Sequence, residues 1–465
     1  MGIKGTGMAA LAEILADREA RITGSDGPER FYTDRILRHL GIPYWESFDA
    51  AHIDSDIRLV IYSAAYEPSE NPELVAAAAK GIPMLSYPEA LGLLSESSDA
   101  SGVSGTHGKT TTVAMAGTIL KGWKIPATVL AGSEVESFGG RSTLILGGKY
   151  FVAETCEYRR HFLHFHPQRI VVTGVEADHL DYFKDLEDVL SAFLSYSMNL
   201  PGDGQLIINH DDRGAREVEN RVREDRSDVE IIPYGKTAQG MFRIEEIETG
   251  PGQTRLRLSG LSEPLILRIP GAHSAYNAAA AIALSTSVLK REGRGLTADA
   301  IHAMAEGIAG FQGSRRRSEI LGTAKDVLFI DDYGHHPTEI SSTLAGLKSF
   351  YPGRRIVVDF MPHTYSRTKA LLMEFGTCFS DAEVVILHRV YSSAREQRDG
   401  SVDGKTLHRE VSRHHPQVVY FEEPGESVGF LESTLKPGDL FVTMGAGDNW
   451  RVGRKLFDRM SKDET

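Results

Sequence analysis

The chain has 465 residues, which is more than one hydrophobic core usually serves, so two or three domains are expected. Hydrophobic residues make up 41% and charged residues 25% of a globular-type composition, and the net charge of −13 argues against a large nucleic-acid surface. No apolar run reaches the roughly 18 residues of a membrane span, and no signal peptide opens the chain. Cys156 and Cys378 give neither a disulfide framework nor zinc spacing. We expect a cytoplasmic protein that acts on small molecules, without a nucleic-acid partner or a membrane span.

Residues 1–97 predict a Rossmann-like α/β domain. The segment opens with a glycine turn, an amphipathic helix and a short strand that ends at Asp26. Residues 57–65 read as a buried strand, and 69–94 as a proline-started helix, a short strand and another helix.

The glycine turn of this domain normally follows a strand, yet only Met1 and Gly2 precede it. We expect either that the true start lies upstream or that the first strand is absent, and we favour a mis-set start or a truncated sequence.

Residues 98–318 predict a central nucleotide-binding domain, and residues 319–465 a second Rossmann-like domain. The strand before the central glycine loop, near 100–104, is weak, and a long helix of small residues covers 273–289. The clearer strands are 142–148, 150–155, 169–175, 204–209 and 229–235, then 327–333, 355–360, 382–390, 417–421 and 439–447. Strands that alternate with helical patterns favour parallel sheets, so the fold class is α/β.

The stretch SGVSGTHGKTTT indicates a phosphate-binding loop, although Val103 stands where the usual pattern has its first glycine. Gly105 and Gly108 let backbone N–H groups wrap a phosphate at a helix start. Lys109, which we expect to be exposed, would reach the β and γ phosphates, and the Thr110 hydroxyl would face Mg²⁺. The alternative is a glycine turn capped by threonine.

Acids and histidines follow two apolar strands of the same domain. Glu154 ends the strand YFVAE, and Glu176, Asp178 and His179 follow RIVVTGV. Ligands in open α/β sheets sit at the carboxyl ends of strands, and Mg²⁺ takes one or two carboxylates beside phosphate oxygens. Ordinary surface-loop acids are the alternative.

Two stretches of the last domain are rich in charged and imidazole groups. DDYGHHPTEI covers 331–340, and DFMPHTYSRTKALL brings His363, Ser366 and Arg367 into a helix start, where arginine suits a carboxylate or phosphate. From the residues alone, the sequence indicates phosphoryl transfer to a substrate held by a flanking domain. An NAD-linked oxidoreductase, suggested by the glycine turns, would leave the Gly-Lys-Thr loop unexplained.

These motifs resemble, in order and over nearly the whole chain, the Mur ligase family. The resemblance rests on the stretches GTHGKTTT, VEADHLDYF, HSAYNAAAA, DDYGHHPTE, PHTYSRT and GAGD. The last three are similar to those of members that join L-alanine to UDP-N-acetylmuramate. The resemblance implies a UDP-sugar domain, an ATP domain and an amino-acid domain. It also implies ATP and Mg²⁺ as cofactors, an acyl-phosphate intermediate, a role in peptidoglycan precursor synthesis, and a monomer or weak homodimer.

The same resemblance implies roles for single residues. The catalytic residues would be Lys109, His179, His335 and Arg367. Nucleotide contacts would come from Gly105, Thr106, His107, Gly108, Lys109, Thr110, Thr111, His273, Asn277, Arg316, Asp332 and Tyr333. Substrate contacts would come from Gly5, Thr6, Gly7, Ser25, Asp26, Ser63, His363 and Arg367, the last for the alanine carboxylate. The metal ligands would be Thr110, Glu154 and His179.

Thr364, Gly174 and Ser274 depart from residues common in the family, and the loop after Glu154 lacks the usual acidic run. Two alternatives stay open within this resemblance. One is a recycling ligase that adds a whole peptide to UDP-N-acetylmuramate. The other is a UDP-sugar-binding protein whose ligase activity has decayed.

Overall fold

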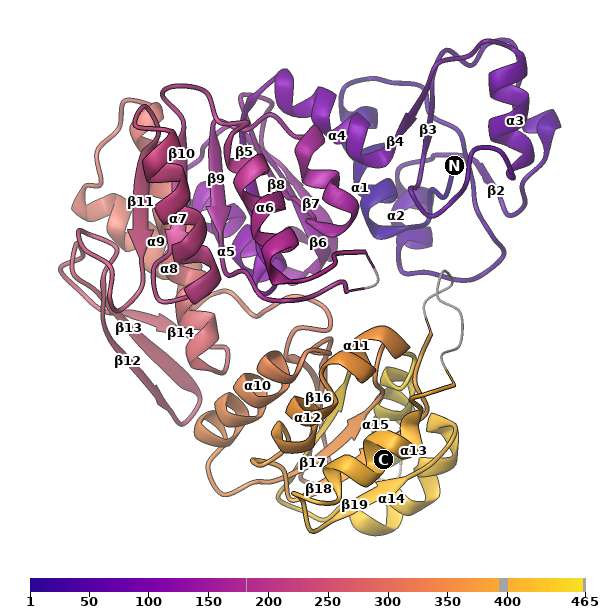
Figure 1. Cartoon of the computed structure of the whole chain (residues 1–465), viewed down its shortest axis with the longest axis vertical. Helices are drawn as coiled ribbons and strands as arrows, with labels where there is room; N and C mark the ends of the chain where they lie inside the picture. The colour runs from indigo at the N-terminus through magenta and orange to yellow at the C-terminus, as the bar shows by residue number, and fades with distance from the viewer. Residues whose placement is uncertain (181, 393–399, 463–465) are drawn as a thin grey trace. The chain divides into compact units, whose positions relative to one another are not determined.

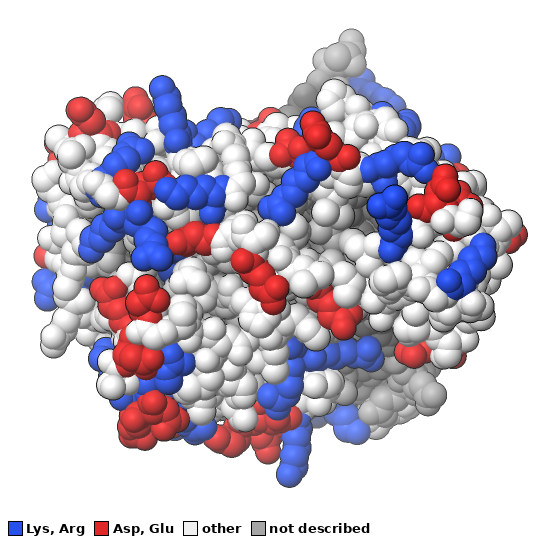
Figure 2. Space-filling view, turned by 90° about the horizontal axis from the view of Figure 1, so that it is seen from above, with Lys and Arg blue, Asp and Glu red and all other residues white. Residues whose placement is uncertain are grey.

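The structure is a computed structural model that describes residues 1–180, 182–392 and 400–462 (Figure 1). It divides into two compact units. The first comprises Met1–Val175, Leu190–Pro233 and Ala280–Met304, and the second comprises Glu176–Val189, Tyr234–Ala279 and Ala305–Thr465. Within the described residues, no helix is long and apolar enough to cross a membrane. On the face drawn in Figure 2, basic and acidic side chains are interspersed.

The first unit begins with short elements that form two separate two-stranded parallel sheets, β1–β2 and β3–β4. They are α1 (Thr6–Asp17), β1 (Gly24–Ser25), α2 (Thr33–His39), β2 (Tyr44–Trp45), η1 (Ala50–His52), β3 (Val60–Tyr62), α3 (Pro72–Ala79), β4 (Met84–Ser86) and α4 (Tyr87–Glu96). The strand expected over 57–65 has only three residues. No strand precedes α1 in this part of the described chain, and two small sheets stand where one was expected.

A seven-stranded sheet forms the rest of the first unit, in the order β11-β10-β9-β5-β8-β6-β7. Its strands are β5 (Asp99–Ser104), β6 (Ala127–Val135), β7 (Arg141–Ile145), β8 (Tyr150–Glu154), β9 (Arg169–Val172), β10 (Gln205–Asn209) and β11 (Glu230–Tyr234). The associated helices are η2 (Glu136–Phe138), α5 (Lys109–Gly122), η3 (Tyr158–His164), α6 (Leu186–Ser197), α7 (Arg213–Asp225), α8 (Ala272–Arg291) and α9 (Ala298–Ala309). β7 pairs antiparallel with β6, so the sheet is parallel, as expected, except at this edge.

The strand that the sequence marked as weak, β5, lies in the middle of this sheet between β8 and β9. The small residues of β5 explain both its weak sequence pattern and its central, closely packed position. A Cβ at Gly102 would lie 2.1 Å from the Tyr196 hydroxyl oxygen, so the close approach of this aromatic residue requires glycine there. A strand built of small residues for close packing contains few of the β-branched residues by which strands are detected in a sequence.

The second unit contains two sheets. An antiparallel one, β12 (Ile244–Gly250), β13 (Gln253–Leu258) and β14 (Leu265–Leu267), was not predicted. The other has the order β15-β16-β20-β17-β18-β19 and is parallel except for β15. Its strands are β15 (Glu319–Ala324), β16 (Val327–Asp332), β17 (Arg355–Phe360), β18 (Val384–Leu387), β19 (Val418–Tyr420) and β20 (Asp439–Met444). Its helices are α10 (Pro337–Phe350), α11 (Tyr365–Ala370), α12 (Leu372–Thr377), α13 (Gly404–Val411), η4 (Pro424–Ser427), α14 (Val428–Thr434) and α15 (Trp450–Lys462).

Side chains at alternating strand positions of this larger sheet pack into two different hydrophobic clusters. Val358 packs in the cluster with Leu344 of α10, whereas its neighbour Val357 packs with Leu456 of α15. Alternation of this kind is the geometry of a strand covered by helices on both faces, and it accounts for the continuous apolar runs in the sequence.

A charged pair is buried at the carboxyl ends of β17 and β18. His388 Nε2 lies 3.0 Å from Asp359 Oδ2, and neither side chain is exposed. Asn449 donates to Asp359 Oδ1 at 3.0 Å. Burial by itself would lower the pKa of His388, but the Asp359 carboxylate outweighs burial and raises that pKa.

We expect Asp359→Ala to lower the free energy of unfolding by about 3–5 kcal/mol, because it leaves a buried imidazole without its anionic partner. Glu432→Ala is the matched control, since it removes an exposed ion pair with Arg459 and should cost less than about 1 kcal/mol. Urea denaturation of both variants measures the difference, and equal losses would contradict the prediction.

The raised pKa of His388 also fixes a pH dependence. The pair contributes its full stability below the ordinary histidine pKa, about 6.5, and loses it as the pH rises through the higher pKa of the folded state. The difference in the free energy of unfolding between the wild type and Asp359→Ala should therefore become smaller as the pH rises through the folded-state pKa of His388.

Candidate active site

The loop from Gly105 to Gly108 joins the end of β5 to the start of α5. Gly105 has φ 132° and Gly108 has φ 80°, a region that favours glycine. A Cβ at Gly105 would lie 2.0 Å from Thr173 Oγ1, so the loop also needs glycine for space. Thr106 N donates to Gly174 O at 2.9 Å and ties the loop to the end of β9. The result is a helix N-terminus preceded by a glycine loop, which is the backbone arrangement that binds phosphate.

Two of the predicted metal ligands meet beside this loop. The Thr110 hydroxyl donates to Glu154 Oε2 at 2.7 Å, because β8, which ends at Glu154, is the sheet neighbour of β5. A Cβ at Gly132 on β6 would lie 2.2 Å from the same carboxylate oxygen, so this glycine makes room for Glu154. A hydroxyl and a carboxylate are hard oxygen donors of the kind that Mg²⁺ prefers. The third predicted ligand, His179, belongs to the other unit.

The expectation of an exposed Lys109 is wrong. Its side chain is 13% exposed, and Nζ lies 3.1 Å from Glu157 Oε2, on a side chain that is 3% exposed. Burial would lower the pKa of Lys109, but Glu157, together with Cys156 and Glu154, raises that pKa above its ordinary value, so the lysine is a cation at neutral pH. Glu157 was not among the predicted residues. Its only signal is its place three residues after Glu154 in the same loop.

The residues predicted for the sugar nucleotide gather at the start of α1. Gly5 and Thr6 begin the helix, and Lys4 N donates to Asp26 Oδ2 at 2.7 Å at the end of β1. A Cβ at Gly7 would lie 2.7 Å from the Tyr87 hydroxyl, so glycine lets the tyrosine reach this turn. Burial, followed by the Glu154 carboxylate, raises the pKa of Tyr87, so its hydroxyl keeps its proton.

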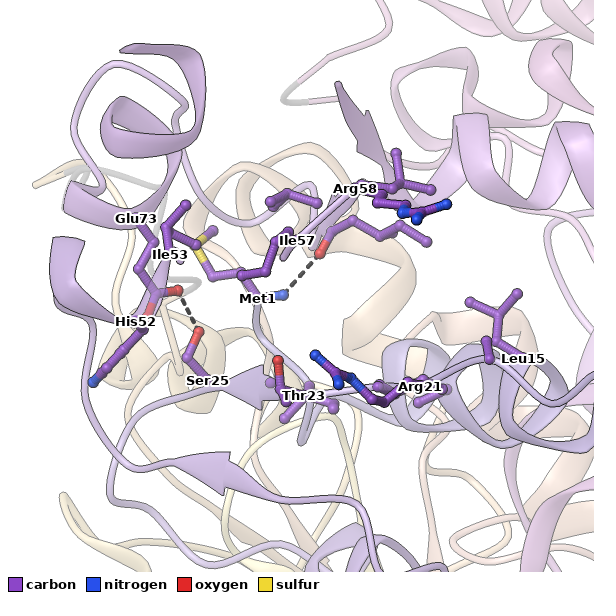
Figure 3. A pocket seen from close by; sticks show the side chains of 18 of the residues that line it. Met1, Leu15, Arg21, Thr23, Ser25, His52, Ile53, Ile57, Arg58 and Glu73 are labelled. Carbon is purple, nitrogen blue, oxygen red and sulfur yellow. Dashed lines mark hydrogen bonds and ion pairs between the residues drawn. The ribbon is translucent and has the colours of Figure 1, made fainter. Parts of the chain in front are cut away.

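Ser25 and Ser63 occupy neighbouring positions of this region. The Ser25 hydroxyl donates to the Glu73 carboxylate (Figure 3), and Ser63 N donates to Met1 O at 3.1 Å. Lys4, which was not predicted, is fully buried and donates from Nζ to Gly27 O at 2.8 Å and to Glu29 O at 3.0 Å. Lys4 thereby fixes the loop that follows Asp26.

In the second unit, Arg316 and Arg317 lie against one aromatic ring. Their guanidinium groups are 5.1 and 5.2 Å from the centroid of Tyr333, a distance at which cations are attracted to the ring. Arg316 also pairs with Asp331 at 3.0 Å. Asp332 accepts hydrogen bonds from the backbone N–H groups of Ser318 and Gly334, each at 2.7 Å. The structure thus brings Arg316, Asp332 and Tyr333 together, whereas His273 and Asn277 lie one turn apart on α8.

Arg367 is paired with an acid in this structure. Its Nε and one terminal nitrogen donate to Asp178 Oδ1 at 3.0 and 2.6 Å, and both side chains are 7% exposed. Burial would raise the pKa of Asp178, but Arg367, with His179 and His335, holds it well below its ordinary value. The Asp178 carboxylate is therefore bound to Arg367, the residue that was predicted to bind the carboxylate of the amino acid.

Two histidines lie beside this pair. His363 Nδ1 is 3.3 Å from an Arg367 nitrogen, and the rings of His335 and His363 are 6.0 Å apart. Burial and then the Arg367 cation lower the pKa of His335 well below its usual value, so the imidazole is neutral at physiological pH. Neutral imidazole can accept a proton, which suits a group near an amine that must lose one.

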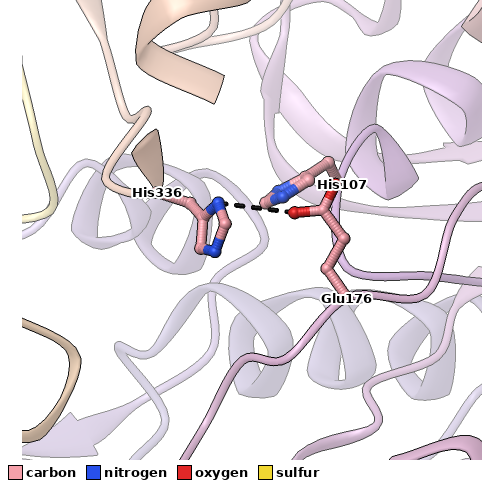
Figure 4. A group of neighbouring side chains, drawn as sticks. All are labelled: His107, Glu176 and His336. Carbon is pink, nitrogen blue, oxygen red and sulfur yellow. Dashed lines mark ion pairs between the residues drawn. The ribbon is translucent and has the colours of Figure 1, made fainter. Parts of the chain in front are cut away.

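The segment before Asp178 is anchored to the start of α10. Glu176 Oε2 accepts from the Thr338 hydroxyl at 3.1 Å and lies 3.5 Å from His336 Nδ1 (Figure 4). Among the non-glycine residues with positive φ in the described chain are His179, Arg316 and Thr364, with φ of 53°, 57° and 65°.

Comparisons with known proteins identify the family. Family models described as Mur ligase family, catalytic domain, Mur ligase middle domain, and Mur ligase, glutamate ligase domain match residues 1–98, 103–285 and 316–447. A UDP-N-acetylmuramate–L-alanine ligase of Treponema pallidum is 48% identical over 463 residues, which cover 100% of this chain and 96% of that protein. The corresponding ligase of Desulfitobacterium hafniense is 39% identical, with 98% of each chain covered.

Solved structures give the same picture. The UDP-N-acetylmuramate–alanine ligase of Thermotoga maritima superposes with a TM-score of 0.80 at 26% identity, covering 99% of this chain and 98% of that one. A murein peptide ligase of Psychrobacter arcticus, with a TM-score of 0.66 and 21% identity over 99% and 98% of the chains, shares the fold.

The buried partner of Lys109 gives a stability prediction. Lys109→Ala should lower the free energy of unfolding by about 3 kcal/mol, because the buried Glu157 carboxylate then loses its lysine counter-charge. Adding Glu157→Gln should recover most of that loss, since the amide needs no counter-charge. Thermal unfolding of the single and double variants tests this.

Lys149→Ala is the control, because Lys149 is an exposed lysine paired with Glu292 and should cost less than about 1 kcal/mol. If the double variant is no more stable than Lys109→Ala, the buried pair is not the cause of the loss.

Proposed function

The chain belongs to the Mur ligase family, and on that premise we propose that it is an ATP-dependent ligase that joins L-alanine to the lactyl carboxylate of UDP-N-acetylmuramate. One observation carries the choice of substrates. The 48% identity to a UDP-N-acetylmuramate–L-alanine ligase extends over the whole chain, including both the phosphate loop and the arginine site. The reaction forms an amide bond, releases ADP and phosphate, and serves peptidoglycan precursor synthesis.

The phosphate loop supports the first half of this reaction. A carboxylate is a poor acylating agent in water, and transfer of the γ-phosphoryl group of ATP gives it a leaving group. The backbone N–H groups after Gly105, with the Lys109 cation, can bind the phosphates and stabilise the charge that spreads over them. Thr110 and Glu154 would hold Mg²⁺, which neutralises the same charge.

The arginine site supports the second half. Arg367 offers a planar pair of donors to the carboxylate of alanine, which would take the place that Asp178 has in the structure. His335, whose imidazole is neutral and whose ring lies 6.0 Å from that of His363, would receive a proton from the attacking amine. The roles of His179, His273 and Asn277, and the expectations of a cytoplasmic monomer or weak homodimer, remain predictions.

The recycling ligase is the second candidate, favoured only by a shared fold with the murein peptide ligase of Psychrobacter arcticus. A protein with decayed activity is less consistent with the intact group of Lys109, Thr110 and Glu154.

One experiment separates these functions. ADP release is measured with UDP-N-acetylmuramate and MgATP, while the amine is either L-alanine or the tripeptide L-alanyl-γ-D-glutamyl-meso-diaminopimelate. We expect turnover with L-alanine, little with the tripeptide, and loss of both on chelation of Mg²⁺. Preference for the tripeptide would assign the recycling activity, and no ADP release with either amine would indicate decay.

Arg367→Ala should raise the KM for alanine by about 10–100-fold, the loss of a charge-assisted hydrogen-bonded pair of about 1.5–3 kcal/mol, while the KM for ATP changes little. Arg459→Ala, in an exposed ion pair of α15, is the control and should leave both constants unchanged. Steady-state kinetics with each substrate varied gives the answer, and equal increases in both KM values would speak against a carboxylate contact.

A further inference from the structure

A charged network is buried where the parallel strands β17, β18, β19 and β20 of the second unit end. Asp359 is the penultimate residue of β17, and His388 directly follows β18. Each comes two residues after a member of the hydrophobic cluster around Leu456, Val357 in β17 and Ile386 in β18. Because side chains of a strand alternate between its faces, both polar groups continue this apolar face at its carboxyl end.

The Asp359 carboxylate joins elements that are far apart in the chain. His388 Nε2 lies 3.0 Å from Asp359 Oδ2, which also accepts from the Ser427 hydroxyl of η4 at 3.3 Å. Asn449, just before α15, donates to Asp359 Oδ1 at 3.0 Å. All of these side chains are fully buried. His388 Nδ1 lies 3.2 Å from Phe421 O just past β19, so the imidazole links this strand end to the carboxylate.

Asn449 ties the end of β20 to the same point. Its side-chain nitrogen donates to Asp359 O at 2.9 Å and to Met444 O, in the last residue of β20, at 3.0 Å. Met444 O also accepts from Met361 N at 3.1 Å. A Cβ at Gly445, where φ is 118°, would lie 2.3 Å from Met361 O. The strand ends are therefore held in one close-packed arrangement at the point where they turn into loops.

Two of these loops belong to the proposed amine site. The loop after β17 carries His363 and leads to Arg367 in α11. The loop after β18 is bonded to it, because Tyr391 N donates to Pro362 O at 2.8 Å and Thr364 N donates to Tyr391 O at 3.0 Å. The buried ion pair has one partner at the base of each loop, so it fixes the distance between the two loops.

Stability alone does not require an ion pair at this position, because apolar residues of similar volume often replace a buried pair without loss. Ion pairs and hydrogen bonds do, however, hold groups in defined directions, as a binding site requires of the residues that support it. On the premise of the proposed function, we propose that Asp359, His388 and Asn449 are positioning residues for the amine substrate. They set the two loops at the separation that binding of alanine requires. None of the three is exposed, so they act through the loops and not by contact with alanine.

The test uses a double variant, Asp359→Leu with His388→Leu, which replaces both charged groups by apolar ones. It should unfold within a few degrees of the wild type, because neither charge is left without its partner. Its KM for alanine should rise about tenfold, since small displacements of binding groups are costly, while kcat and the KM for ATP change less than about twofold. A merely structural role would lower the fraction of active enzyme, and hence kcat, without changing the KM for alanine.

Asp359→Asn is the conservative variant. The asparagine oxygen can accept from Asn449, and its side-chain nitrogen can donate to an unprotonated His388 Nε2, so the directional contacts are retained without the charges. The KM for alanine should therefore stay within about twofold of the wild-type value. An increase as large as that of the double variant would overturn the proposal, because directional contacts would then not be what positions the loops.

Arg355→Met is the matched control at the opposite end of the same sheet. Arg355 pairs with Asp439 at 2.7 Å where β17 and β20 begin. Loss of this pair should leave the KM for alanine unchanged, whatever its effect on the unfolding temperature. A rise in this KM in Arg355→Met equal to that in the double variant would overturn the proposal, and so would an unchanged KM in the double variant.

Hydrogen exchange gives a second readout, which does not depend on the reaction. The Tyr391 and Thr364 amides bond the two loops to each other, so they should exchange at least about tenfold faster in the double variant and at the wild-type rate in Asp359→Asn. Wild-type protein that releases no ADP with L-alanine would contradict the proposed function. Wild-type ADP release together with unchanged exchange in the double variant would contradict the positioning role alone.

Discussion

The close packing of β5 at the centre of the seven-stranded sheet is the constraint on which the phosphate site depends. Gly102 admits Tyr196 against the strand, and Gly105 admits Thr173 at its end. Both contacts exclude larger side chains, so they fix where the strand stops and where α5 begins. Because β8 is paired directly with β5, Glu154 emerges beside Thr110. Sheet register, rather than proximity in sequence, produces the hydroxyl–carboxylate pair.

The charged groups assigned to substrates already have partners inside the protein. Lys109 is paired with Glu157, and Arg367 with Asp178. These acids hold flexible cationic side chains in one conformation, and without them the cations would lie partly buried and unpaired. Each acid also resembles an anionic ligand, since a carboxylate is what Arg367 is proposed to bind. Under the proposed function, binding of a phosphate at Lys109 and of a carboxylate at Arg367 would exchange one anion for another, which limits the cost of desolvating the cation.

The two nucleotide-related groups of residues belong to different units, and each is organised locally. The phosphate loop is built from sheet register in the first unit, and the Arg316–Tyr333–Arg317 stack from a loop and a strand end in the second. A ligase that activates an acid and then presents it to an amine needs both a phosphate site and an amine site. The structure contains a glycine loop at a helix start in the first unit and a buried arginine–acid pair in the second, and full-length relatives are named UDP-N-acetylmuramate–L-alanine ligases.

The sequence by itself determined the phosphate loop, the acids at strand ends and the α/β class, because these depend on local patterns of glycine, charge and alternating helices and strands. Only the tertiary structure decided that Lys109 is largely buried against Glu157 and that Asp178 binds Arg367. It also decided that β12–β14 form an antiparallel sheet and that Asp359 meets His388 at the ends of two strands. Pairings of this kind join residues that are distant in the chain or indistinct in composition, and they are set by strand order and packing, which no local pattern records.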